Sequence, residues 1–223
     1  MNFSPNTFAD LMTKEIQQNK CLPQIRTEED FKAASERGFK AAFDHLTQNQ
    51  KPLADWTLDD LAKIHRLYFA DLYPHAGQFR KGGDLASFNG RVGADSPHIP
   101  QELNLLLDQV RTLQQKLPSA DTPQGVTDRL ALIAFAHGRL ALVHPFRDGN
   151  GRWTRLIVSS LEKQLLPDTG SRTSLPKHIY INALKALPSN MGPLMAYHAE
   201  KHGLRPSTLK SVPPPFPVQV THR

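Results

Sequence analysis

The side chains with the clearest chemical potential gather between His144 and Arg155, in the run HPFRDGNGRWTR. Positive φ angles are accessible to three residues of this turn, Gly149, Asn150 and Gly151, so a ligand can approach its backbone closely. The helix expected after the turn would direct free N–H groups and a positive dipole end toward an anion. Arg152 and Arg155 lie three residues apart on that helix and suit the charged end of a polyphosphate. The pattern therefore indicates a phosphate-binding turn.

A histidine and an acid accompany this turn. Asp148 would repel a phosphate unless a divalent cation joined them, and Mg²⁺ is typically held by one or two carboxylates together with substrate phosphates. His144 titrates near neutral pH and can accept a proton from an attacking hydroxyl group. An ordinary turn would explain DGNG alone, but not the histidine and arginines around it. Arg152 and Trp153 do not fit a calcium-binding loop, and the chain contains no P-loop motif.

Three other reactive features have simpler explanations. Cys21 is the single cysteine and has no evident partner for catalysis, so it excludes an intramolecular disulfide and favours a reducing compartment. His65 lies within a predicted amphipathic helix and is expected to be structural. The run HAEKH, from His198 to His202, departs by one position from the zinc-binding H-E-x-x-H pattern. We therefore do not predict a metal site there.

Composition narrows the class of protein. The chain has 223 residues, 39% hydrophobic and 22% charged, as expected of a globular domain. The net charge of +6 indicates attraction to anions, but the basic residues form no stripe, so we predict no nucleic-acid site. Neither a membrane span nor a Sec-type signal peptide is recognisable. The expected location is cytoplasmic, with delivery into another cell by a specialised secretion system left open.

The remaining sequence predicts helices that would hold the turn in place. Apolar residues recur at helical spacing in seven segments: 27–46, 57–73, 100–117, 126–143, 152–166, 178–187 and 191–204. The segment 126–143 is apolar on most of its surface, which predicts a central, buried helix. A glycine-rich excursion near 80–97 contains an Asn89-Gly90 turn that suggests a short hairpin. We predict one all-α domain with this excursion.

The run from His144 to Arg155 resembles, at every defining position, the Fic-domain motif H-x-F-x-[DE]-G-N-G-R-x-x-R. The resemblance extends to Ile64–Arg80 and Tyr180–Leu184, and covers roughly residues 30–200. It implies a Fic-type helical domain with a β-hairpin flap inserted between helices. The implied domain boundaries are an N-terminal extension at 1–26, a Fic domain at 27–205 and a proline-rich tail at 206–223. The flap would lie at about 78–98 and the active-site loop at 144–152.

The resemblance also implies an activity, the transfer of AMP from ATP to a tyrosine, threonine or serine hydroxyl of a target protein. His144 would be the general base, Asp148 would hold Mg²⁺ against the α- and β-phosphates, and Phe146 would anchor the loop. The nucleotide-binding residues would be Gly149, Asn150, Gly151, Arg152 and Arg155, with Lys81 and Tyr180 as further candidates. The flap would pair with an extended target segment, with Phe88 as a candidate contact.

Alternatives stay open at this point. The G-N-G-R sequence favours AMP over a phosphoryl group or phosphocholine, but not over UMP. A catalytically idle binding module and a de-AMPylating enzyme would carry the same fold. Many Fic proteins are inhibited by a helix bearing [ST]-x-x-x-E-[GN], and no glutamate here has those neighbours. A separate antitoxin-like protein could supply such a helix.

Overall fold

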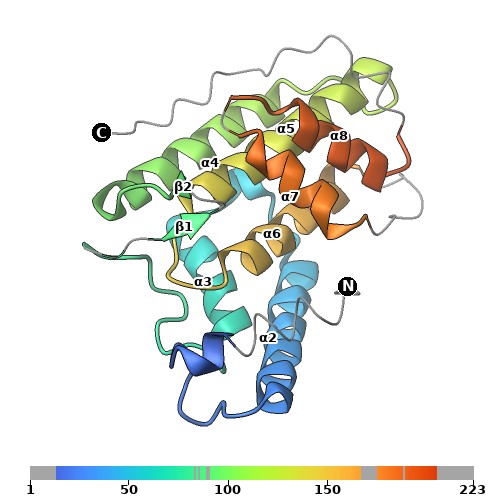
Figure 1. Ribbon diagram of the computed structural model, residues 1–223. Coiled ribbons are helices and arrows are strands. Elements are labelled where there is room, and N and C mark those ends of the chain that lie inside the picture. The colour runs from blue at the N-terminus through green and yellow to red at the C-terminus, as the bar shows by residue number, and fades with distance from the viewer. Residues whose placement is uncertain are drawn as a thin grey trace.

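The computed structural model describes residues 14–82, 84, 86–88, 91–166, 175–187 and 189–204. The Asn89-Gly90 turn and the proline-rich tail at 206–223 lie outside these residues, as does the side chain of Phe88. The described residues are mostly helical, as the all-α prediction requires. In Figure 1, α2 and α3 occupy the lower part of the molecule, α4, α5, α7 and α8 the upper part, and α6 the region between them.

The helices α2 (Glu28–Asn49) and α3 (Leu58–Phe69) begin in the same way. Thr27 and Thr57 each accept a hydrogen bond from the backbone three residues on, and Asp30 and Asp60 complete the two capping boxes. The helices pack closely at Gly38, where a Cβ would lie 1.9 Å from the Tyr68 carbonyl oxygen. The short 3₁₀ helix η1 (Leu53–Asp55) joins them.

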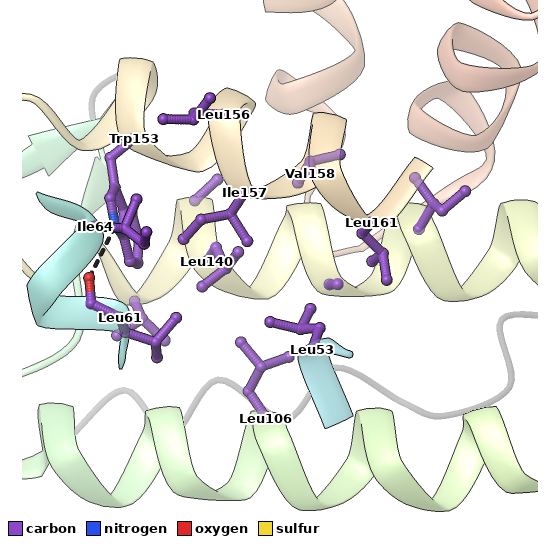
Figure 2. Close-up of a cluster of buried hydrophobic side chains, with 14 of the residues drawn as sticks. Leu53, Leu61, Ile64, Leu106, Leu140, Trp153, Leu156, Ile157, Val158 and Leu161 are labelled. Carbon is purple, nitrogen blue, oxygen red and sulfur yellow. Dashed lines mark hydrogen bonds between the residues drawn. The ribbon is translucent and has the colours of Figure 1, made fainter. Parts of the chain in front are cut away.

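The central layer consists of α4 (Ile99–Gln115), α5 (Pro123–Val143) and α6 (Asn150–Leu165). The prediction that 126–143 is central and buried is confirmed, because α5 is buried without a break from Leu130 to Ala141. Figure 2 shows the apolar cluster where α6 and α5 meet α3, α4 and η1. Within it, the Trp153 indole N–H donates to the Leu61 carbonyl at 3.1 Å and joins α6 to α3.

Two short helices, α7 (Lys177–Lys185) and α8 (Gly192–Lys201), pack against each other, and α8 also packs on α5. The excursion after α3 contains β1 (Ser87–Phe88), β2 (Arg91–Val92) and the 3₁₀ helix η2 (Ser96–His98). The two strands are antiparallel, with Ser87 opposite Val92 and Phe88 opposite Arg91. Each has only two residues, so most of the described excursion is irregular.

Candidate active site

The motif loop connects the end of α5 to the start of α6 and is closed by one side chain. The Asn150 amide nitrogen donates to the Phe146 carbonyl at 2.7 Å, and its oxygen accepts from the Phe146 N–H at 2.9 Å. Phe146 is fully buried, as expected of an anchor, and its ring stacks on His65 with 3.6 Å between ring centroids. Asn150 therefore holds the loop closed with its side chain, and only its backbone can face a ligand.

The glycines of the motif differ in conformation. Gly149 has φ +79°, and a Cβ there would lie 2.7 Å from two atoms of the Phe69 ring. Gly151 and Asn150 are ordinary residues of α6, so of the three residues able to adopt a positive φ only Gly149 does so. The second left-handed residue of the loop is His144, with φ +49°, at the C-terminal cap of α5. The left-handed conformation of His144 turns the chain away from α5.

His65 fixes the far side of the loop. Its Nδ1 accepts from the Gly77 N–H at 2.9 Å, so the ring proton lies on Nε2, which donates to the Asp148 carbonyl at 3.0 Å. Burial lowers the pKa of His65 to about 3, so the ring is neutral. The structural role expected of His65 now has a definite form: it fastens α3 and the following loop to the backbone of Asp148.

Arg80 was not singled out by the sequence, yet it joins the excursion to the end of α5. Its guanidinium donates to four carbonyl oxygens, those of Asp84, Ala94, Val143 and His144, at 2.7–3.3 Å. Its own N–H donates to the Pro145 carbonyl at 2.8 Å. Arg80 is buried, and no local pattern marks it, because the carbonyls of Val143 and His144 that it binds lie over 60 residues away.

His144 lies between these supports, and its Nδ1 faces a backbone carbonyl. Its Nδ1 lies 3.3 Å from the Ala141 carbonyl, which can only accept, so this nitrogen carries the proton and Nε2 has a lone pair. Burial lowers the pKa of His144, although the Ala141 hydrogen bond opposes the shift. The ring is half-buried and neutral near pH 7, which is the state that a proton acceptor needs.

Asp148 is paired with cationic or cation-forming groups. Its carboxylate lies 3.1 Å from the Lys20 ammonium and 3.5 Å from the His75 Nε2. Burial alone would raise the pKa of Asp148, but hydrogen bonds and charge from His75 and Lys20 lower it below its usual value. The carboxylate is therefore ionised and already attracts a cation. Lys20 belongs to a part of the chain in which sequence analysis predicted no site residue.

The two motif arginines point to different neighbours. Arg152 is buried, and its Nη2 donates to the Tyr73 hydroxyl, which donates in turn to Glu15. Its guanidinium also lies 4.8 Å from the centre of the Phe69 ring. Arg152 therefore directs its guanidinium into the interior beside α3. Glu15 does not have the neighbours of the inhibitory motif, because Leu11 precedes it by four positions and Ile16 follows it.

Arg155 extends toward α7 instead. Its guanidinium lies 5.6 Å from the centre of the Tyr180 ring and forms a hydrogen bond to the Tyr180 hydroxyl. Tyr180 is only 7% exposed, and its hydroxyl also contacts His137 at 3.0 Å. Lys81 has an exposed side chain at the base of the excursion, and its backbone N–H donates to Asp84 at 3.1 Å. Direct nucleotide contacts by Tyr180 and Lys81 stay predictions.

This arrangement of a closed loop at a helix N-terminus matches a known family. Residues 55–161 match the family model described as the Fic/DOC family. The match supports a Fic-type domain within this chain, spanning the motif and the helices around it. Its sequence is 28% identical over 155 residues to proteins named protein adenylyltransferase Fic from Aedes aegypti and Drosophila melanogaster. These matches cover 67% of this chain but only 29% of each relative, so the chain corresponds to less than a third of those proteins.

Solved Fic structures share the fold. The BepC protein of Bartonella tribocorum, solved with bound AMPPNP, has a TM-score of 0.58 and 19% identity. The alignment covers 82% of this chain and 90% of that one. Fic-1 from C. elegans, residues 134–508, has a TM-score of 0.58 and 20% identity, covering 89% of this chain and 55% of that one. At this identity the likeness establishes the helical Fic fold.

Clusters of metal-binding side chains and membrane-spanning helices are both absent from the described residues. In that part of the chain, no group of three or more histidine, cysteine, aspartate or glutamate side chains is arranged to hold a metal ion. Among the same residues, no helix is both long and apolar enough to cross a membrane.

Proposed function

We propose that this chain is a nucleotidyltransferase that moves AMP from ATP to a hydroxyl side chain of a target protein. One observation carries the proposal: His144, whose Nδ1 faces the Ala141 carbonyl, lies on a complete Fic motif that closes onto the N-terminus of α6. The names of the Aedes and Drosophila relatives support the same type of reaction.

His144 would act on the attacking group. Its Nε2 would take the proton of the target hydroxyl while the hydroxyl oxygen forms a bond to the α-phosphorus of ATP. The bond between the α-phosphorus and the oxygen bridging to the β-phosphorus would break, and pyrophosphate would leave. The Nδ1–H bond to the Ala141 carbonyl supports this role, because it holds the ring in the tautomer that leaves Nε2 free of a proton.

The α6 N-terminus would bind the phosphates. The left-handed Gly149 and the helical residues Asn150 and Gly151 would offer backbone N–H groups to phosphate oxygens, and Gly151 is exposed. Arg155 would contact the outer phosphates from the same end of α6. Arg152, which is buried against Phe69 and Tyr73, would contribute positive charge and hold the loop in place. Lys81 and Tyr180 are further candidates for the nucleotide site.

Asp148 fits a magnesium ligand. It is an ionised carboxylate with the Lys20 ammonium group 3.1 Å away. A bound cation would take the place of that ammonium group. Magnesium bound there would neutralise charge on the phosphates that lie against the loop. Asp148 would hold the ion, while the His65 hydrogen bond to its carbonyl would keep the loop backbone in position.

The excursion from 78 to 98 would act as the flap. The antiparallel pair β1 and β2 supports docking of an extended target segment by strand addition, with Phe88 as the candidate side-chain contact. Arg80 would keep this excursion next to His144, since it donates to the carbonyls of both Ala94 and His144. An antitoxin-like inhibitory partner is a further proposal, because no glutamate of the chain carries the inhibitory motif.

Transfer of a labelled nucleotide tests the proposal. Purified protein, Mg²⁺ and a cell lysate would be incubated with ATP labelled at the α- or the γ-phosphate. AMP transfer predicts protein-bound label from α-labelled ATP alone. Label from γ-labelled ATP would indicate phosphoryl transfer, and label from UTP alone would indicate UMP transfer. Release of label from AMPylated protein would indicate the reverse reaction. ATP binding without any transfer would favour an idle binding module.

A further inference from the structure

A row of buried polar side chains runs from α6 through α8 and α5 to α7 and returns to the motif. The His198 Nδ1 lies 2.8 Å from the Glu162 carboxylate, and the His198 Nε2 lies 3.0 Å from the His137 Nδ1. The His137 Nε2 lies 3.0 Å from the Tyr180 hydroxyl, which is hydrogen-bonded to Arg155. His137 and His198 are each 1% exposed and Glu162 is fully buried.

The partners at both ends set the direction of every hydrogen bond in this row. An ionised Glu162 can only accept, so the His198 Nδ1 carries a proton and its Nε2 accepts from the His137 Nδ1–H. The His137 Nε2 must then accept from the Tyr180 O–H, and the Tyr180 oxygen accepts from Arg155, which can only donate. All four bonds are satisfied in one direction, from Arg155 to Glu162.

The charges around the row agree with this direction. Lys201 donates to Glu162 at 2.6 Å, and the His202 Nε2 lies 3.5 Å from the same carboxylate. Burial opposes ionisation of Glu162, but His198, His202 and Lys201 together hold its pKa well below the usual value. Burial lowers the pKa of both His137 and His198, so both rings are neutral. The HAEKH run therefore supplies two histidines that face one carboxylate.

We propose that Glu162, His198, His137 and Tyr180 form a polarised relay that positions the Arg155 guanidinium for phosphate binding. The inference rests on the proposed function, because it assigns Arg155 to the nucleotide. Each bond polarises the next, so the carboxylate makes Tyr180 a stronger acceptor for Arg155 than an isolated hydroxyl would be. Tyr180, which the sequence suggested as a nucleotide-binding residue, then acts through Arg155 as a positioning residue.

Burying the relay costs more free energy than burying apolar side chains would, because its four polar groups must all be hydrogen-bonded. Apolar replacements would pack α5, α7 and α8 without that cost. The position of the relay explains its use, because it ends at an arginine of the motif. Without Tyr180, the Arg155 guanidinium would lose its hydrogen-bonding partner on α7 and would sample more orientations at the mouth of α6.

Two matched substitutions separate this role from packing. Tyr180→Phe removes the hydroxyl and keeps the ring. Tyr197→Phe makes the same change on a neighbouring tyrosine, whose ring lies 5.4 Å from that of Tyr180 and which has no hydrogen bond to the relay. Loss of one hydrogen bond to a charged group predicts about tenfold weaker Mg²⁺–ATP binding for Tyr180→Phe. We expect less than about a twofold change for Tyr197→Phe.

A double-mutant cycle tests whether Tyr180 acts through Arg155. In an Arg155→Ala background, Tyr180→Phe should change ATP affinity by less than about twofold, because the group that it positions is gone. An unchanged effect of Tyr180→Phe in that background would overturn the proposal, as would equal effects of the Tyr180 and Tyr197 substitutions. If wild type bound no ATP, the proposed function would fail, and the relay itself would be decided by the measurement below.

Nuclear magnetic resonance of the nucleotide-free protein provides that independent measurement. The wild-type ¹⁵N shifts should show protonated Nδ1 and unprotonated Nε2 in both His137 and His198. The Arg155 Nε–H signal should indicate a restrained guanidinium in wild type and Tyr197→Phe, and a mobile one in Tyr180→Phe. A protonated Nε2 in either histidine, or the same Arg155 signal in all three proteins, would overturn the relay whatever the nucleotide affinity.

Discussion

The two glycines of the motif should respond in opposite ways to the same substitution. Gly149→Ala places a methyl group on a residue with φ +79°, at a point 2.7 Å from two atoms of the Phe69 ring. Phe69 is fully buried and cannot move aside. Gly151→Ala adds the same methyl group to an exposed helical residue, 3.4 Å from the Arg155 guanidinium, an ordinary contact distance at a flexible side chain.

The expected magnitudes follow from these surroundings. The left-handed backbone costs alanine about 1–2 kcal/mol, and overpacking a rigid core costs about 1–3 kcal/mol more. Gly149→Ala should therefore lower the free energy of unfolding by about 2–5 kcal/mol and the melting temperature by roughly 4–20 °C. Gly151→Ala should raise the free energy by up to about 1 kcal/mol, because alanine favours helix.

Differential scanning calorimetry of the two variants beside wild type measures this contrast directly. Nucleotide should be absent, so that only the fold is compared. The reasoning would be refuted if both variants melted at the same temperature, or if Gly149→Ala were as stable as wild type. Either result would mean that Gly149 does not adopt the left-handed conformation against Phe69 in solution.

Three further predictions concern charge and pH. Lys20→Met should lower the Mg²⁺ concentration needed for half-maximal ATP binding about fivefold, because a partly exposed ion pair with Asp148 is worth about 1 kcal/mol. Lys14 is exposed on the same segment, and Lys14→Met should leave that concentration unchanged when binding is measured by calorimetry. The lowered pKa of His144 predicts that kcat/KM falls only below about pH 6.5, and a midpoint above 7 would contradict its role as base. His65, with a pKa of about 3, takes up a proton only on unfolding, so stability should decline as pH falls from about 6.5 toward 3. His65 should account for a loss of about 2 kcal/mol in the free energy of unfolding between pH 7 and 5. If this free energy fell equally steeply with pH in wild type and in His65→Gln, the assignment would be refuted.

Much of the fold could be predicted from the sequence because its helices carry strong local signals. Thr27 and Thr57 mark two helix starts, and the apolar run of α5 indicates its central place. The boundaries were less predictable. The helix expected to reach residue 73 ends at Phe69, where the chain turns before Pro74. The helix α5 starts earlier than expected, because Thr122 caps it and Pro123 lies in its first turn.

The candidate site was predictable in its residue types but not in its geometry. The motif indicates Asp148 and His144 by chemistry, whereas the partners that hold them come from distant segments. Arg80 and His65 act on loop backbone more than 60 residues away, and neither has a local pattern that marks it. The separation of Arg152 from Arg155 likewise depends on which helices lie beside α6, and spacing along one helix cannot show that.

The most direct test of the central claim measures binding and transfer in the same His144→Ala protein. The loop is held by other side chains, so this variant should bind Mg²⁺–ATP within about twofold of wild type. Transfer of label from α-labelled ATP should fall by about 10²-fold or more, as expected for loss of a general base. Transfer at the wild-type rate by His144→Ala would contradict the account.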